Sequence, residues 1–160
     1  MAAAAAGAVS CQGVDSSAAA VCLAQANVEL NGFATTCSFT KSDVVNFLRD
    51  QDLAGTFDVV ICDPPKLAPS VKDLPRATRK YRQINSLAMR AVRPGGLLLS
   101  CTCSGAMTQS GRFVAMLHES AVAAGRTLTV LRTSGAACDH VLHPCCPESN
   151  YLTAVLLQVS

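Results

Sequence analysis

Residues 57–66 read "FDVVICDPPK", an apolar run that two prolines end abruptly. A short apolar run bounded by breaking residues is typical of a buried central β-strand. Proline has no N–H to donate to a strand ladder, so the predicted strand ends at Cys62. Asp63 therefore falls just beyond the carboxyl end of a central strand, where α/β folds bind their ligands.

On both sides of this run, short β-like stretches alternate with helical ones, which favours an α/β fold with a mostly parallel sheet. Further strands are expected at 8–14, 33–40, 97–103, 128–132 and 151–159. Helices are expected at 17–31, 42–49, 78–92 and 112–124, the second of them capped by Ser42, with a long loop over 134–150. We find no internal repeat or linker, and so expect a single domain over residues 1–160.

Composition excludes few classes of function. The 160 residues carry a net charge of +2, which says little about partners, and no uninterrupted apolar span reaches the length needed to cross a membrane. Nine cysteines fall mostly within apolar runs, and the opening residues lack the basic character of a signal or transit peptide. We therefore expect free thiols in a reducing compartment, either the cytoplasm or an organelle interior.

Three acidic residues follow successive predicted strands, namely Asp15, Asp43 and Asp63. An acid after one strand can accept hydrogen bonds from the hydroxyls of a ribose, and an acid after another can accept from an adenine amine. Taken singly, Asp15 and Asp43 are equally well explained as helix caps or first-turn acids. The three together favour a nucleoside ligand.

The stretch "SCTCSG", residues 100–105, ends a second apolar run and holds two cysteines. Cys101 lies inside the run and is expected to pack in the core. Cys103 lies past the strand end, where side chains face the cleft, and is the better candidate for a nucleophile. Position alone leaves core packing as the favoured role for either thiol. Pro64 and Pro65 also have two possible roles. They either form a rigid turn without a chemical role, or leave carbonyl groups free to accept a hydrogen bond from a substrate amine.

Four segments resemble the class I S-adenosylmethionine-dependent methyltransferases, and more narrowly the RlmI-like family of ribosomal RNA 5-methylcytosine methyltransferases. They are "GVDSSAAAVCLAQANVELNG", "FDVVICDPPKLAPS", "YRQINSLAMRAVRPGGLLLSCTCSGAMT" and "CDHVLHPCCPESNYL". They occur in family order along nearly the whole chain. The resemblance implies a Rossmann-like sheet, S-adenosylmethionine as cofactor, and methyl transfer to C5 of cytosine in RNA.

The resemblance also implies roles for individual residues. Cys103 would be the nucleophile and Asp63 would lie beside the methyl donor and the target base. Asp15 would bind the cofactor ribose and Asp43 the adenine amine. The whole cofactor-binding set would be Asp15, Ser16, Ser42, Asp43, Asp63 and Pro64, with no metal site.

A dense basic cluster between the two strand ends is a candidate for holding RNA phosphates, although a plain solvated face explains any single member equally well. Its members are Lys66, Lys72, Arg76, Arg79, Lys80 and Arg82.

Three other functions remain open. An amino-methyltransferase would place an aromatic residue where Lys66 stands. A zinc-binding module would draw on Cys101, Cys103 and the Cys and His residues of 138–146, whose spacing matches no familiar zinc motif. An inactive RNA-binding or interaction remnant is the third. It follows from a departure from the family, because the chain is expected to lack the family's first strand and glycine-rich loop, which would leave the sheet incomplete.

The missing glycine-rich loop leads to the first prediction. That loop would supply backbone donors to the cofactor's carboxylate, so we expect this chain alone to bind S-adenosylmethionine weakly or not at all. Isothermal titration calorimetry measures this directly. A dissociation constant in the micromolar range would contradict the prediction.

Overall fold

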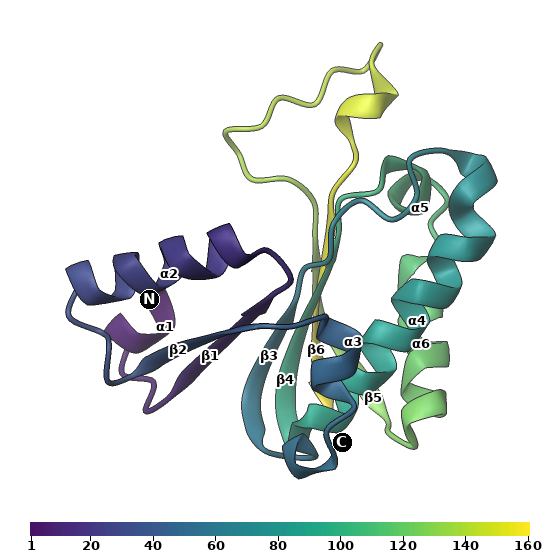
Figure 1. Cartoon of the computed structure of the whole chain (residues 1–160). Helices are drawn as coiled ribbons and strands as arrows, with labels where there is room; N and C mark the ends of the chain where they lie inside the picture. The colour runs from purple at the N-terminus through teal and green to yellow at the C-terminus, as the bar shows by residue number, and fades with distance from the viewer. The chain divides into compact units, whose positions relative to one another are not determined.

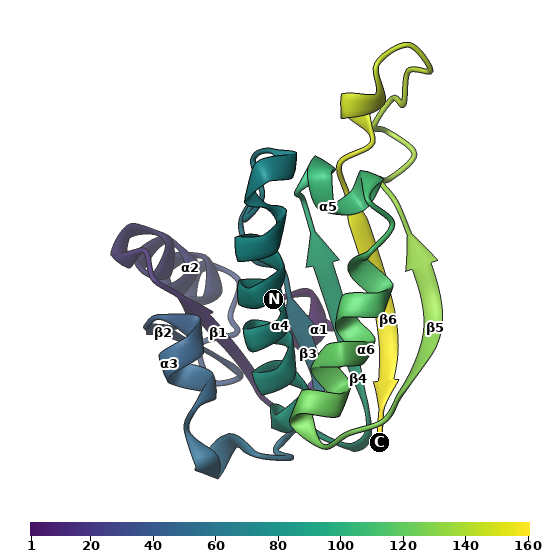
Figure 2. The same cartoon turned by 90° about the vertical axis from the view of Figure 1, so that its right-hand side faces the viewer.

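The computed structural model describes residues 1–160, apart from the side chain of Gln51. Its contacts separate the chain into two compact units, Met1–Arg49 and Asp50–Ser160. Both alternate strands with helices, which confirms the α/β class (Figures 1 and 2). The expectation of one domain over residues 1–160 stays a prediction.

The first unit is a two-stranded parallel sheet with one long helix and two short ones. Strand β1 pairs with β2 from Cys11 opposite Cys37 to Asp15 opposite Lys41. The side chain of Ser17 accepts a hydrogen bond from the amide of Ala20 and so starts the long helix at Ala18, one residue after the start expected from the sequence. The elements are α1 (Ala2–Ala5), β1 (Cys11–Asp15), α2 (Ala18–Leu30), β2 (Cys37–Lys41) and α3 (Val44–Leu48).

The second unit is a four-stranded sheet in the order β3-β4-β6-β5. Strands β3 and β4 are parallel, whereas β6 runs antiparallel to both of its neighbours. The strands are β3 (Phe57–Cys62), β4 (Val92–Thr102), β5 (Leu128–Ser134) and β6 (Thr153–Val159). The α-helices are α4 (Leu74–Ala91), α5 (Gly105–Gln109) and α6 (Phe113–Ala124), with single 3₁₀ turns η1 (Gln51–Leu53), η2 (Val71–Asp73) and η3 (Pro147–Ser149).

The core of the second unit lies between its sheet and its two long helices. Helices α4 and α6 lie side by side on one face of the sheet (Figure 2). Tyr81 of α4 is fully buried there and meets Phe113 edge to face, with 5.8 Å between the ring centroids. Leu98 of β4 and Leu157 of β6 are fully buried beneath the helices. This packing fixes α4 against the strand that leads to Cys103.

The structure differs from the sequence-based expectations at element ends. Helix α4 starts at Leu74 rather than residue 78, because it continues the 3₁₀ turn η2, which Ser70 and Asp73 cap, and because Pro75 suits a first helical turn. The short helix α5 was not expected. The expected cap Ser42 was wrong: the side chain of Asp43 accepts from the amide of Asn46 and caps α3.

No helix in the described part of the chain is both long and apolar enough to pass through a bilayer.

Candidate functional site

The carboxyl ends of β3 and β4 lie next to each other in the second unit. Their parallel register sets Cys62 opposite Ser100, so Asp63 and the segment after Thr102 emerge at the same edge of the sheet. Two segments that are some forty residues apart in the sequence therefore meet where α/β folds bind ligands. The structure thus brings together the two residues predicted to be catalytic.

Cys103 is half-buried at this edge. Its sulfur lies 3.9 Å from the carbonyl oxygen of Pro64, within range of a weak thiol hydrogen bond. Asp63 and Pro65 are exposed on either side of that carbonyl. The thiol is therefore held against the "DPP" turn and remains accessible to a ligand there.

The neighbouring thiols are in a different environment. Cys62 and Cys101 are only 8% and 9% exposed. Burial raises the pKa of the Cys62 thiol to about 12. Burial also raises the pKa of Cys101, and the nearby charge of Asp63 adds to the effect. Because the thiolate is the nucleophilic form, both are poor nucleophiles near neutral pH. This agrees with the prediction that Cys101 is a packing residue.

The sequence analysis missed a buried set of hydroxyl groups beside this edge, here called the hydroxyl cluster and made of Tyr81, Thr102 and Ser104. The Tyr81 hydroxyl lies 2.7 Å from Oγ1 of Thr102 and 2.9 Å from Oγ of Ser104. Ser104 Oγ also accepts from the amide of Ala68, at 3.0 Å. The cluster joins α4, the Cys103 segment and the loop after Asp63. No local sequence signal marks it, because Tyr81 lies 21 residues from Thr102 and 23 residues from Ser104 along the chain.

The other predicted ligand residues lie at the carboxyl edge of the sheet in the first unit. Asp15 ends β1, and its Oδ1 accepts from the amide of Ser17 at 2.7 Å. Asp43 uses its Oδ1 to cap α3, at 3.0 Å from the amide of Asn46. The amide of Ser42 donates to the backbone oxygen of Asp15, which holds the two segments together. Both carboxylates are exposed, as is Ser16.

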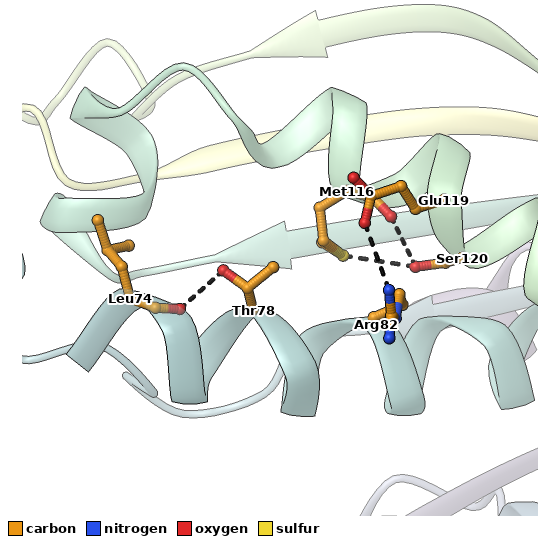
Figure 3. A network of polar contacts seen from close by, with 6 residues as sticks. All are labelled: Leu74, Thr78, Arg82, Met116, Glu119 and Ser120. Atoms are coloured by element: carbon orange, nitrogen blue, oxygen red, sulfur yellow. Dashed lines mark hydrogen bonds and ion pairs between the residues drawn. The ribbon is translucent and has the colours of Figure 1, made fainter.

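The predicted RNA-binding residues are Lys66 in the loop after β3 and Arg76, Arg79, Lys80 and Arg82 on α4, and all five are exposed. Arg76, Arg79, Lys80 and Arg82 border one shallow depression on the surface of the second unit. Arg82 also forms an ion pair with Glu119 of α6, with 3.6 Å between Nη1 and Oε2 (Figure 3). This pairing makes Arg82 less available to a ligand than Arg76, Arg79 and Lys80.

Within the described residues, no three His, Cys, Asp or Glu side chains are grouped closely enough to hold a metal ion. This includes the Cys and His residues of 138–146, for which the structure shows other contacts. His140 contacts the backbone oxygen of Ser149 at 3.0 Å, and its ring packs edge to face on Tyr151.

Comparison with known families agrees with this geometry. Residues 2–146 match the family described as "Methyltransferase domain". The chain belongs to that family.

Curated relatives of this methyltransferase-family chain include two named "Ribosomal RNA large subunit methyltransferase I". The one from Aeromonas hydrophila is 39% identical over 147 residues, covering 91% of this chain and 37% of the relative. The one from Shewanella denitrificans is 37% identical over 159 residues, covering 98% and 40%. The chain thus spans about two fifths of the length of the curated relatives it matches.

Solved structures of methyltransferases share the fold. SMU.776, a methyltransferase in complex with SAH, superposes with a TM-score of 0.80 at 23% identity, covering 98% of this chain and 41% of that one. NSun6 from Pyrococcus horikoshii, with SFG, gives a TM-score of 0.61 at 15% identity and covers 92% and 40%. At these identities the likeness concerns the fold alone, and it confirms the predicted Rossmann-like methyltransferase class.

The different environments of the thiols lead to a testable prediction. At pH 8, iodoacetamide should alkylate Cys103 at least tenfold faster than Cys62 or Cys101, because a raised pKa keeps a thiol protonated and burial blocks the reagent. Because burial raises the pKa of Cys62 to about 12, its rate should stay low through the neutral range and keep increasing with pH. Peptide mapping by mass spectrometry measures each rate, with the exposed Cys138 as the reference. Equal rates for Cys101 and Cys103 would contradict this assignment.

Proposed function

We propose that this chain carries the catalytic part of an S-adenosylmethionine-dependent enzyme that methylates C5 of cytosine in ribosomal RNA, with Cys103 as the nucleophile. The observation that carries the proposal is the accessible Cys103 thiol held against the "DPP" turn, 3.9 Å from the Pro64 carbonyl. The names of the curated relatives support an RNA substrate from the large ribosomal subunit.

The proposed chemistry starts from the weak nucleophilicity of cytosine C5. Addition of the Cys103 thiolate to C6 forms an S–C6 bond and moves the C5=C6 electron pair onto C5. Acting as a general acid, Asp63 would donate a proton to N3 and so balance the negative charge that develops in the ring. After C5 has gained its substituent, loss of the C5 proton to a base restores the double bond and expels the Cys103 thiolate, and the N3 proton returns to the Asp63 carboxylate. The target base must be unpaired or flipped out to reach the sulfur.

The acidic edge of the first unit suits the nucleoside part of S-adenosylmethionine. Asp15 and Asp43 each use Oδ1 for their own helix start, and the described residues form no hydrogen bond to either Oδ2. An open carboxylate oxygen on each can accept from the ribose hydroxyls and from the adenine amine. Ser16 and Ser42 of the same unit belong to the proposed cofactor-binding set. When bound, S-adenosylmethionine supplies a methyl group activated by its positively charged sulfur.

RNA would be held by the exposed basic residues around the start of α4 and in the loop before it. Arg and Lys side chains bind phosphates without reading the base sequence, and they place the RNA relative to the thiol. We place this chemistry in a reducing compartment, because a nucleophilic thiol must stay reduced.

Hydrogen exchange at C5 tests the covalent step without the cofactor. Addition of Cys103 to C6 makes C5 basic, so unpaired cytidines in an RNA oligonucleotide should take up deuterium at C5 in D₂O. Mass spectrometry of the digested RNA measures the uptake. Cys103→Ala should abolish it, and Asp63→Asn should slow it about 100-fold, as expected for loss of a general acid.

The matched control is Cys138→Ala, which removes an exposed thiol far along the chain and should leave the exchange unchanged. Exchange that survives in Cys103→Ala would rule out Cys103 as the nucleophile. An amino-methyltransferase would show no such exchange in either protein.

The salt dependence of RNA binding tests the basic surface. Removal of one phosphate contact lowers the slope of log K against log salt by about 0.7 for single-stranded RNA. Arg79→Ala should therefore weaken binding and reduce the slope by about this amount, as measured by fluorescence anisotropy. Arg132→Ala removes the same charge from an exposed position on β5 and should leave the slope unchanged. Equal effects of the two substitutions would favour a merely solvated basic face.

A further inference from the structure

We propose that Tyr81 is a positioning residue, whose buried hydroxyl fixes the direction in which Cys103 points. The effect of Tyr81 on catalysis rests on the proposed function, whereas its effect on the position of Cys103 can be tested without RNA or cofactor.

The argument begins with the two neighbours of Cys103. Thr102 is the last residue of β4, and Ser104 has an extended backbone with φ −90° and ψ 104°. In an extended segment, successive side chains point to opposite sides. Both neighbours point inward, since each side-chain oxygen lies within 2.9 Å of the Tyr81 hydroxyl. Cys103, between them, must point the other way, toward the Pro64 carbonyl.

Tyr81 therefore holds the Cys103 segment at two points, one on each side of the thiol. A single hydrogen bond would leave the segment free to rotate about one anchor, whereas two bonds to one rigid ring remove that freedom. The amide of Ser104 also donates to Thr102 Oγ1, at 3.2 Å. This bond within the segment links the two residues that flank Cys103.

The same cluster also reaches the loop that carries Asp63. The amide of Ala68 donates to Ser104 Oγ at 3.0 Å, so the chain after the "DPP" turn is tied to the residue that follows Cys103. The two segments that carry the predicted catalytic side chains are thus both joined to the buried hydroxyl cluster. The Tyr81 ring is held in turn by its edge-to-face contact with Phe113.

The sequence neighbourhood of Tyr81 strengthens the inference. One helical turn later, Asn85 donates to the backbone oxygen of Tyr81 at 2.9 Å and accepts from the Ser100 hydroxyl at 2.6 Å. Helix α4 therefore bonds alternate residues of β4 (Ser100 and Thr102) and then Ser104, all on the side opposite to Cys103. A core tyrosine needed only for its bulk would not require this alignment.

The test compares Tyr81→Phe, which removes one oxygen and keeps the ring, with Tyr151→Phe at the other tyrosine of the chain as the matched control. Thr102→Val is the second variant, because it removes the opposite oxygen with little change of shape. Alkylation rates of Cys103, Cys101 and Cys62 are measured by peptide mapping. The exchange of C5 hydrogen in RNA is measured on the same proteins.

We expect Tyr81→Phe and Thr102→Val to raise the Cys103 alkylation rate about tenfold, since the released segment opens more often. Cys62 and Cys101 should stay protected, and Tyr151→Phe should behave as the unchanged protein. The C5 exchange should fall by about 100-fold, as expected when a reacting atom is misplaced by about 1 Å. Faster alkylation at Cys103 alone, together with slower exchange, is a combination that general loosening of the fold does not produce, because loosening would also expose Cys62 and Cys101.

An unchanged Cys103 rate in a folded variant would overturn the inference, as would an equal rise at all three thiols. If Tyr81→Phe does not fold, Thr102→Val decides. If the unchanged protein shows no C5 exchange at all, the proposed function fails, while the alkylation rates still decide whether Tyr81 holds Cys103.

Discussion

The parallel pairing of β3 with β4 is the constraint on which the geometry of the second unit depends. Parallel strands cannot be joined by a tight turn, so the chain must return along the sheet, and α4 makes that return. The register of Cys62 opposite Ser100 then sets both strand ends at one edge. The returning helix packs beneath the same edge, so residues from three separate segments meet there without any of them being adjacent in the sequence.

Side chains alternate along β4, so residues 100–103 place hydroxyl groups on one face of the sheet and cysteines on the other. Ser100 and Thr102 point to α4, where their hydroxyl groups are fully buried and hydrogen-bonded. A buried hydroxyl without a partner costs about 1–3 kcal/mol, so these residues are tolerated only because Tyr81 and Asn85 face them. Cys101 and Cys103 point to the other side. Cys101 is still covered there, while Cys103 has passed the strand end and is half-exposed.

Local patterns in the sequence predict much of this fold and less of the site. The strand ending at Cys62 and a helix starting within one residue of Ala18 were predicted because proline and serine act on their immediate neighbours. The cap of α3 was misassigned by one residue, since Ser42 and Asp43 both have capping side chains. The hydroxyl cluster could not be predicted, because Tyr81, Thr102 and Ser104 meet only after α4 has packed on β4. Buried serine and threonine hydroxyls look like ordinary polar residues until their partners are known.

The three carboxylates show why the "DPP" sequence suits a reacting group. Asp15 accepts from the amide two residues later, and Asp43 accepts from the amide three residues later, so part of each is used locally. At Asp63 the next two residues are Pro64 and Pro65, which have no amide hydrogen to offer. The described residues form no hydrogen bond to its carboxylate. The prolines therefore stiffen the turn and, by removing the nearest donors, also leave the Asp63 carboxylate without a local hydrogen-bond partner, as the role proposed for it would require.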